Sequence, residues 1–349
     1  MRKTKTIATL GPESWGREVL RGMIAAGADI LRINLSYVSL GHGYDFLAEV
    51  VAEARKIAHD LGRVVEIMID LPGHKFRLGE FIDRKVKLGD SIELTSKVIL
   101  QDGQVPFPYE DYLSLMRVGQ EIIFGDGIPR LEVVEEGSKV VQCKVTLAGL
   151  LKSHYGLTAR GLKVADLGLP SLTKADHLGL KFAIRVKAEQ VVMSYGTSAK
   201  QMDTFIKCYR GLGGFGKVLF KYELAEAGND LEAIVSVSDG GFVGQGDLGL
   251  SVPSEFVPGE AAKVVDAFRV AGKPCIVGTQ LLTSMKKHPF PTHGERAGVH
   301  YNVLIGATGL MVSDETSMGE FPVEVVQILV RLINAAEGIT SKTARVLYK

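Results

Sequence analysis

Short apolar runs alternate with segments of helical spacing along most of this chain of 349 residues. The pattern predicts a strand at residues 5–9 and a helix at 16–26, then strands at 29–33 and 64–69 with a helix at 44–61 between them. Continuous apolar runs of this kind are typical of parallel strands that are buried on both faces.

The alternation resumes after residue 172 and continues almost to the end of the chain. It predicts five more strands, at 190–194, 217–223, 241–243, 274–277 and 309–312, and six helices, at 172–188, 200–210, 230–235, 258–270, 295–304 and 322–336. Eight strands, each followed by a helix apart from one interruption after the third, predict a (β/α)8 barrel spanning residues 1–79 and 167–349. Only about a dozen residues follow the last predicted helix, so we expect no further C-terminal domain.

Residues 80–166 interrupt this pattern with short strands separated by glycine and acidic turns. Residues 125–127 and 135–138 have the composition of hairpin turns between β-branched runs. We therefore predict a small all-β domain inserted after the third barrel strand.

Composition favours small-molecule chemistry. Forty-one basic and forty acidic residues leave a net charge of +1, so no overall field recruits nucleic acid or a membrane surface. The amino terminus fits neither a signal peptide nor a spanning helix, and we expect a cytoplasmic protein. Cys143, Cys208 and Cys275 form no C-x-x-C pair and are expected to be buried thiols.

Polar side chains follow most of the predicted strands, at the barrel end where the loops converge. In strand order they are Arg32, Asn34 and Ser36; Asp70, Lys75 and Arg77; Lys221 and Glu223; Asp247; Thr279; and Ser313, Glu315 and Thr316. A single strand-end Asp or Lys more often caps a helix or forms a salt bridge than takes part in catalysis. The small hydroxyls could equally cap the helices that follow.

The convergence of these side chains nevertheless predicts phosphoryl chemistry. Glu223 and Asp247 end neighbouring strands, so their carboxylates can share one hard cation such as Mg²⁺. Lys221 points to the same side of its strand as Glu223, and Arg32 and Arg77 add the fork geometry that matches phosphate. Residues 211–216, GLGGFG, match a dinucleotide-binding pattern but follow a helix and precede a strand, so we interpret them as a loop.

Seven segments resemble the pyruvate kinase family, in family order over nearly the whole chain. They are TKTIATLGPES (4–14), ADILRINLS (28–36), IDLPGHKFRLG (69–79), KYELAEAG (221–228), GQGDLGL (244–250), AGKPCIVGTQLLTSM (271–285) and MVSDETSMGEFPVE (311–324). The inserted domain falls where that family has its mobile lid. The resemblance implies transfer of phosphoryl from phosphoenolpyruvate to ADP, giving pyruvate and ATP in glycolysis. It also implies Mg²⁺ or Mn²⁺ as cofactor, and a possible homo-oligomer formed through the barrel.

The resemblance also implies roles for individual residues. Glu223 and Asp247 match the Mg²⁺ carboxylates, Lys221 the lysine that stabilises the transferred phosphoryl, and Arg32 the phosphate-binding arginine. Thr279 matches the threonine near the enolate carbon, and Ser313 and Glu315 the proton-delivery region; Gly246 and Asp247 would bind the substrate carboxylate. Asn34 and Arg77 match nucleotide-binding positions, and Asn34, Ser36 and Asp70 match the monovalent-cation region.

The chain also departs from the family pattern. Tyr37, Gln245 and the run 195–197 replace family residues around the site. Lys75 stands where potassium-dependent members carry glutamate and potassium-independent members carry lysine, so we expect that K⁺ is not required.

Two other functions stay open from the sequence. One is a Mg²⁺-dependent lyase of the same barrel type acting on pyruvate or phosphoenolpyruvate; Arg77, Asn34 and the inserted domain argue against it. The other is a binding protein that keeps the fold and has impaired turnover, which Tyr37 and Gln245 favour.

Overall fold

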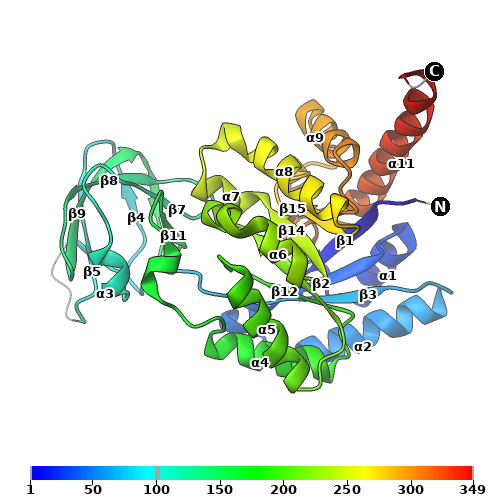
Figure 1. The fold of residues 1–349 in the computed structure, drawn as a ribbon, viewed down its shortest axis with the longest axis horizontal. Coiled ribbons are helices and arrows are strands. Elements are labelled where there is room, and N and C mark those ends of the chain that lie inside the picture. Colours follow the sequence, from blue (N-terminus) through cyan, green and yellow to red (C-terminus); the bar gives the residue numbers. More distant parts are fainter. Residues whose placement is uncertain (1, 99–102, 348–349) are drawn as a thin grey trace.

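The computed structural model describes residues 2–98 and 103–347, and their side chains except at 39, 40 and 339–347. Eight parallel strands close into a barrel in the order β1-β16-β15-β14-β13-β12-β3-β2 (Figure 1). Their bounds are β1 (Lys5–Leu10), β2 (Ile30–Asn34), β3 (Glu66–Asp70), β12 (Gln190–Met193), β13 (Lys217–Tyr222), β14 (Gly240–Gly244), β15 (Cys275–Gly278) and β16 (Gly309–Val312). The predicted (β/α)8 barrel is confirmed.

One apolar side chain from each strand fills the interior of the barrel. These eight buried residues are Ile7, Ile30, Met68, Val192, Leu219, Phe242, Ile276 and Met311. A second core lies between the strands and the surrounding helices. The packed interior leaves the carboxyl end of the strands as the place where polar groups can gather.

Eight helices follow the predicted pattern, and their bounds are α1 (Arg17–Ala26), α2 (Tyr44–Asp60), α4 (Lys174–Arg185), α5 (Ala199–Gly211), α6 (Leu231–Val237), α8 (Val257–Val270), α9 (His293–Leu304) and α11 (Pro322–Leu347). Short helices are α3 (Glu110–Ser114), α7 (Gln245–Ser251), α10 (Asp314–Ser317), η1 (Leu35–Leu40), η2 (Val164–Leu167), η3 (Ala225–Asp230), η4 (Ser254–Phe256) and η5 (Thr283–Lys286). The predicted end of the last helix, at residue 336, was wrong: α11 continues to Leu347 and projects from the barrel in Figure 1. The pattern of apolar positions did not predict the short helix α7, because its sequence, QGDLGLS, has too few residues and too many glycines to show a period.

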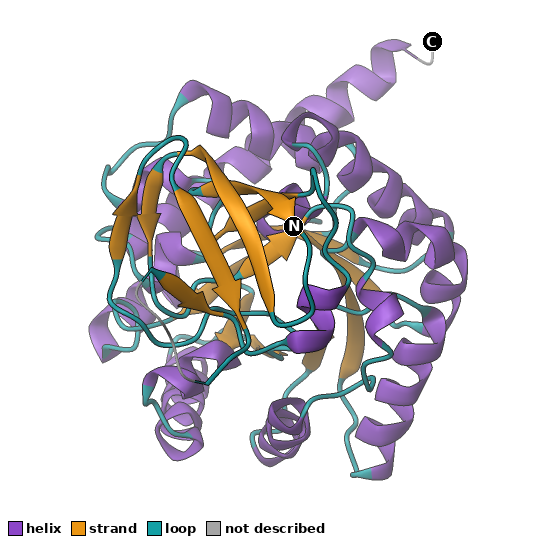
Figure 2. Cartoon of the chain, turned by 90° about the vertical axis from the view of Figure 1, so that its left-hand side faces the viewer, coloured by secondary structure: helices purple, strands orange, loops and turns teal. Residues whose placement is uncertain are grey.

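The inserted segment forms its own sheets and its own core. Six strands lie in the order β11-β7-β8-β9-β5-β6, and β10 pairs with β4. Their bounds are β4 (Arg84–Val86), β5 (Ser91–Thr95), β6 (Gln104–Pro106), β7 (Glu121–Phe124), β8 (Arg130–Glu135), β9 (Val140–Leu147), β10 (Gly149–Leu151) and β11 (Leu157–Ala159). The glycine turn at 125–127 joins β7 to β8, and the turn at 135–138 leads from β8 to β9. Figure 2 shows this sheet in front of the barrel.

Two antiparallel chain segments connect the inserted domain with the barrel. The Leu78 amide donates to the Tyr155 carbonyl and the Leu157 amide to the Phe76 carbonyl, both at 2.9 Å. Arg77 and Gly156 pair as an isolated bridge between the same segments. We call residues 74–77 and 154–157 the hinge.

The sequence also made predictions about the three cysteines and about membrane-spanning helices. Cys143 and Cys275 are buried, whereas Cys208 is partly exposed and its Sγ lies 3.6 Å from His177 Nδ1, so the expectation of a buried thiol was wrong there. Among residues 2–98 and 103–347, no helix is long and apolar enough to cross a membrane.

Candidate functional site

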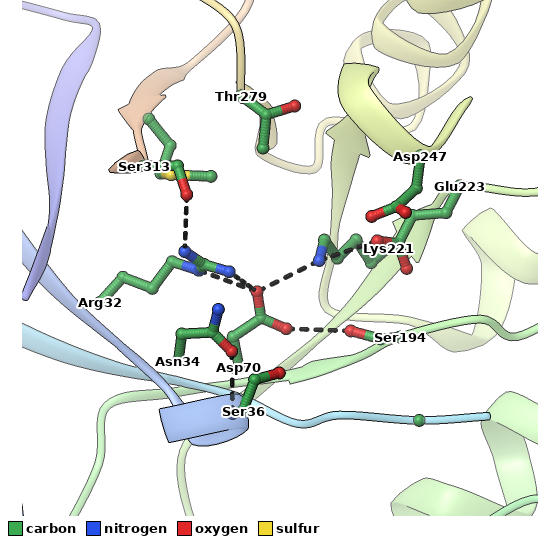
Figure 3. A network of polar contacts seen from close by, with 12 residues as sticks. Arg32, Asn34, Ser36, Asp70, Ser194, Lys221, Glu223, Asp247, Thr279 and Ser313 are labelled. Atoms are coloured by element: carbon green, nitrogen blue, oxygen red, sulfur yellow. Dashed lines mark hydrogen bonds and ion pairs between the residues drawn. The ribbon is translucent and has the colours of Figure 1, made fainter. Parts of the chain in front are cut away.

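A buried ion pair at the ends of β2 and β3 forms the centre of the site. Arg32 Nε donates to Asp70 Oδ2 at 2.8 Å, and Arg32 Nη1 donates to Thr9 Oγ1 at 3.0 Å and to Ser313 Oγ at 3.4 Å. The other Asp70 oxygen accepts a hydrogen bond from Ser194 Oγ at 2.9 Å. Figure 3 shows the contacts of Arg32 and Asp70 with each other and with Ser313 and Ser194. The arginine is therefore held in one orientation by groups from three strands.

Lys221 extends the network across to β13. Its Nζ lies 3.2 Å from Asp70 Oδ2 and 2.9 Å from Glu223 Oε1. Burial alone would lower the pKa of Lys221, but the Asp70 and Glu223 carboxylates outweigh it and raise the pKa above its usual range. Burial would likewise raise the pKa of Asp70, and the Lys221 and Arg32 charges lower it. Lysine and aspartate are both charged at neutral pH.

Glu223 is the most deeply buried carboxylate of the site. Its side chain is 0% exposed, and burial raises its pKa to about 7 in spite of Lys221. Oε2 accepts a hydrogen bond from the Tyr195 amide at 3.1 Å. Oε1 has the ion pair with Lys221 but no hydrogen-bond partner. A buried oxygen with unused acceptor capacity is costly unless a ligand completes it.

Asp247 lies beside Glu223 on the short helix α7, as the sequence predicted for neighbouring strand ends (Figure 3). Its Oδ1 accepts a hydrogen bond from Lys75 Nζ at 2.8 Å. Burial alone would raise the pKa of Asp247, but the Lys75 and Lys221 charges hold it well below its usual range. The Lys75 ammonium therefore forms an ion pair with the Asp247 carboxylate.

Thr279 closes the site from the end of β15. Its φ is 68°, in the left-handed region, as is that of Gln280 at 57°. A β-branched residue is a genuine outlier there, and such strain collects at functional sites. The Thr279 hydroxyl accepts a hydrogen bond from the Gly246 amide at 2.7 Å, which joins the ends of β14 and β15.

Glu315 is buried and supports the loop around Ser313. Its carboxylate accepts hydrogen bonds from the Ser313 amide at 2.7 Å and from the Leu282 amide at 3.1 Å. Burial raises the pKa of Glu315, although these amides oppose the shift. The carboxylate therefore positions the serine and the loop after β15.

Four residues from the sequence analysis lie outside this network. Asn34 Oδ1 accepts a hydrogen bond from the Ser36 amide at 3.1 Å and caps η1. Arg77 Nη1 donates to the His154 carbonyl at 3.2 Å, within the hinge. The Thr316 hydroxyl donates to the Thr9 carbonyl at 2.9 Å, which is a structural contact.

Sequence reasoning gave no site role to three members of the site, although it noted Tyr195 as a departure from the family pattern. Thr9 and Ser194 orient Arg32 and Asp70, and Tyr195 supplies the amide that contacts Glu223. The first lies in β1 and the other two directly follow β12, so the rule that identified the other strand ends could have found them.

A cavity of about 200 Å³ opens between the barrel mouth and the tip of the inserted domain. Its lining includes Gly246, Asp247, Thr279 and Ser313 from the barrel and Asp126 from the β7–β8 turn. Of the predicted substrate-binding positions, Gly246, Asp247 and Thr279 therefore share one cavity that both domains border, whereas Arg32 and Lys221 are not among its lining residues.

The carboxylates of the site suit a hard divalent cation. Glu223 and Asp247 offer oxygen ligands, which Mg²⁺ prefers, and Glu223 Oε1 has unused acceptor capacity. Within the described ranges, no group of three or more His, Cys, Asp or Glu side chains could hold a metal ion. Mg²⁺ commonly keeps several waters and takes one or two protein carboxylates, so this pair fits it.

The fold and the site together define a (β/α)8-barrel enzyme whose mouth gathers buried basic and acidic side chains. The family model described as the pyruvate kinase barrel domain matches residues 1–326. The chain belongs to the pyruvate kinase family.

Curated pyruvate kinases from several organisms are similar to this chain over most of its length. A pyruvate kinase of Agrobacterium vitis is 30% identical over 340 residues, which cover 96% of this chain and 70% of the relative. One of Thermococcus litoralis is 31% identical, covering 96% and 70%. Pyruvate kinase 2 of Synechocystis is 32% identical, covering 98% of this chain and 59% of the relative. These likenesses support pyruvate kinase function, a phosphotransferase activity of glycolysis.

Proposed function

We propose that this mouth transfers the phosphoryl group of phosphoenolpyruvate to ADP, giving ATP and an enolate that is protonated to pyruvate. The observation that carries the proposal is the buried chain of charges Arg32, Asp70, Lys221 and Glu223. The two positively charged side chains of this chain, Arg32 and Lys221, are held in place before any substrate binds. Charges that need no rearrangement are the most effective in stabilising a transition state.

Glu223 and Asp247 would hold Mg²⁺ or Mn²⁺ at this mouth. When bound, the cation neutralises charge on the phosphoryl oxygens. Lys221 would contact the transferring group from the barrel side, and Arg32 would contact the phosphate. Because Asp70 compensates both of these cations, they can stay charged in a buried place.

The substrate carboxylate would bind at Gly246 and Asp247, next to Thr279. The Gly246 amide now donates to the Thr279 hydroxyl, so substrate would take over this donor and free the hydroxyl. Thr279 and Ser313 both line the cavity and would lie near the enolate carbon that receives the proton. Glu315 would act by positioning Ser313.

Asn34 and Arg77 would contact ADP, and the inserted domain, residues 80–166, would close over the mouth and exclude water. Arg77 supports this role because it lies in the hinge, where closure would change its contacts. The β7–β8 turn supports it too, because Asp126 already borders the cavity.

The monovalent cation is proposed to be unnecessary. Asn34, Ser36 and Asp70 mark the region of that site, and Lys75 brings an ammonium of its own into the mouth. Its ion pair goes to Asp247, while Asp70 is already compensated by Arg32 and Lys221. A cytoplasmic location and self-association through the barrel complete the proposal; sedimentation velocity tests the latter.

Pyruvate formation from phosphoenolpyruvate and ADP, with and without Mg²⁺, tests the function. The Mg²⁺-dependent lyase alternative predicts turnover without ADP. An impaired binding protein predicts bound phosphoenolpyruvate and no pyruvate.

A further inference from the structure

Lys75 connects the hinge with the carboxylate that would hold the divalent cation. It lies between β3 and the Arg77–Gly156 bridge, where the chain enters the inserted domain. A Cβ added at Gly156 would fall 3.0 Å from Lys75 Cε, so the lysine stem packs closely against the second hinge segment. From there its ammonium reaches Asp247 Oδ1 at 2.8 Å.

The lysine also contacts the other half of the cation site through Tyr195. Its Nζ lies 5.7 Å from the centre of the Tyr195 ring, and the amide of the same tyrosine donates to Glu223 Oε2. Tyr195 has φ 57°, a left-handed conformation that is uncommon for an aromatic residue. Lys75 therefore contacts Asp247 directly and is linked to Glu223 only through Tyr195.

A divalent cation and this ammonium cannot share Asp247 without cost. Mg²⁺ binds a carboxylate oxygen at about 2 Å, and the Lys75 ammonium lies 2.8 Å from the same carboxylate. Two positive charges so close together repel each other strongly in a partly buried place. The lysine side chain is 32% exposed, so its ammonium can leave Asp247 and still remain in the mouth, as its proposed replacement of K⁺ requires.

We infer that Lys75 is an internal competitor for the divalent cation at Asp247, so that cation binding detaches the lysine and loosens the hinge in one event. This inference rests on the proposed cation site at Glu223 and Asp247. It assigns Lys75 a positioning role that links the cation site to the inserted domain.

Calorimetric titration of the full chain with Mn²⁺ tests the competition without any turnover. Lys75→Met should tighten Mn²⁺ binding by about tenfold or more, because one positive charge beside the site is lost. Lys75→Arg should keep an affinity close to that of the unaltered protein. Lys286→Met is the matched control: this lysine lies at the same mouth but pairs with Asp314 at 3.0 Å, and its removal should change the affinity less.

Hydrogen exchange of the hinge gives a second readout. Saturating Mn²⁺ should speed amide exchange at residues 74–77 and 154–157 in the unaltered protein. In Lys75→Met these amides should exchange fast from the start and respond little to Mn²⁺.

The outcomes separate the inference from the function beneath it. Absence of a Mn²⁺ site in the unaltered protein overturns the cation site and with it the proposed function. A Mn²⁺ site whose affinity is unchanged in Lys75→Met overturns the inference alone, as does an equal tightening in Lys286→Met. Hinge exchange that Mn²⁺ leaves unchanged overturns the link to the inserted domain.

Discussion

Lys221 is a buried ammonium compensated by two carboxylates, and in the proposed mechanism its charge stabilises the transferring group. Lys221→Met should lower kcat by about a thousandfold, the scale of losing one preorganised charge contact, while phosphoenolpyruvate still binds. Lys217→Met, at the exposed start of the same strand, is the control. Steady-state kinetics with a substrate-binding titration decide the matter, and a change confined to KM would contradict the role.

The two carboxylates should act together on the cation. Glu223→Gln and Asp247→Asn each remove one charge from the donor set, so each should weaken Mg²⁺ binding by tenfold or more and abolish pyruvate formation. Circular dichroism should show an intact fold, because both side chains lie at the mouth and outside the barrel interior. Unchanged Mg²⁺ affinity in both variants would refute the assignment.

Lys75 carries a separate prediction about monovalent ions. Rates in potassium and in tetramethylammonium should agree within about twofold, because a compact ammonium provides a charge and hydration similar to those of K⁺. Lys75→Glu should create a requirement for potassium. If the unaltered protein is inactive without K⁺, then Asn34, Ser36 and Asp70 bind a real ion.

Among the elements, strands were predicted well and short helices poorly. Buried parallel strands can be recognised in the sequence as apolar runs. In a parallel barrel the carboxyl ends of all strands lie at the same mouth, so the sequence predicted that Glu223 and Asp247 lie close together, as Figure 3 shows. The seven residues of α7 give no such signal. Side-chain contacts between neighbouring strands, such as Ser194 after β12 to Asp70 in β3, depend on side-chain reach that no local pattern encodes.

The start of α9 shows how one side chain joins two elements. Glu295 accepts hydrogen bonds from the Thr292 amide at 2.7 Å in a capping box and from the Ser284 amide at 2.6 Å in η5. Burial would raise the pKa of Glu295, but the hydrogen bonds from Ser284 and Thr292 outweigh it and lower the pKa. The charged form is thus favoured by folding.

Glu295→Gln should therefore lower the free energy of unfolding by about 1–2 kcal/mol at pH 7. A carboxyl group whose pKa is lower in the folded state than in the unfolded state stabilises the folded protein at pH values above its ordinary pKa of 4.5. This stabilisation is lost as the pH falls through the lowered pKa of the folded state. The difference from the unaltered protein should shrink on acidification in urea unfolding curves. Glu49→Gln, on the exposed face of α2, is the control, and an equal effect there would contradict the prediction.

At the scale of the whole molecule, two domains border one cavity. The barrel supplies the fixed charges, and the β7–β8 turn of the inserted domain reaches the cavity with Asp126. The hinge that carries this turn also carries Lys75 and Arg77. The proposed chemistry at the mouth and the proposed closure of the inserted domain would therefore share the same few residues.

The most direct test of the account is the appearance of pyruvate when the purified chain is mixed with phosphoenolpyruvate and ADP. The account predicts pyruvate and ATP in equal amounts, dependent on Mg²⁺ and on ADP, and their loss in Lys221→Met. Pyruvate formed without ADP, or no pyruvate from a folded chain that binds both substrates and Mg²⁺, would contradict it.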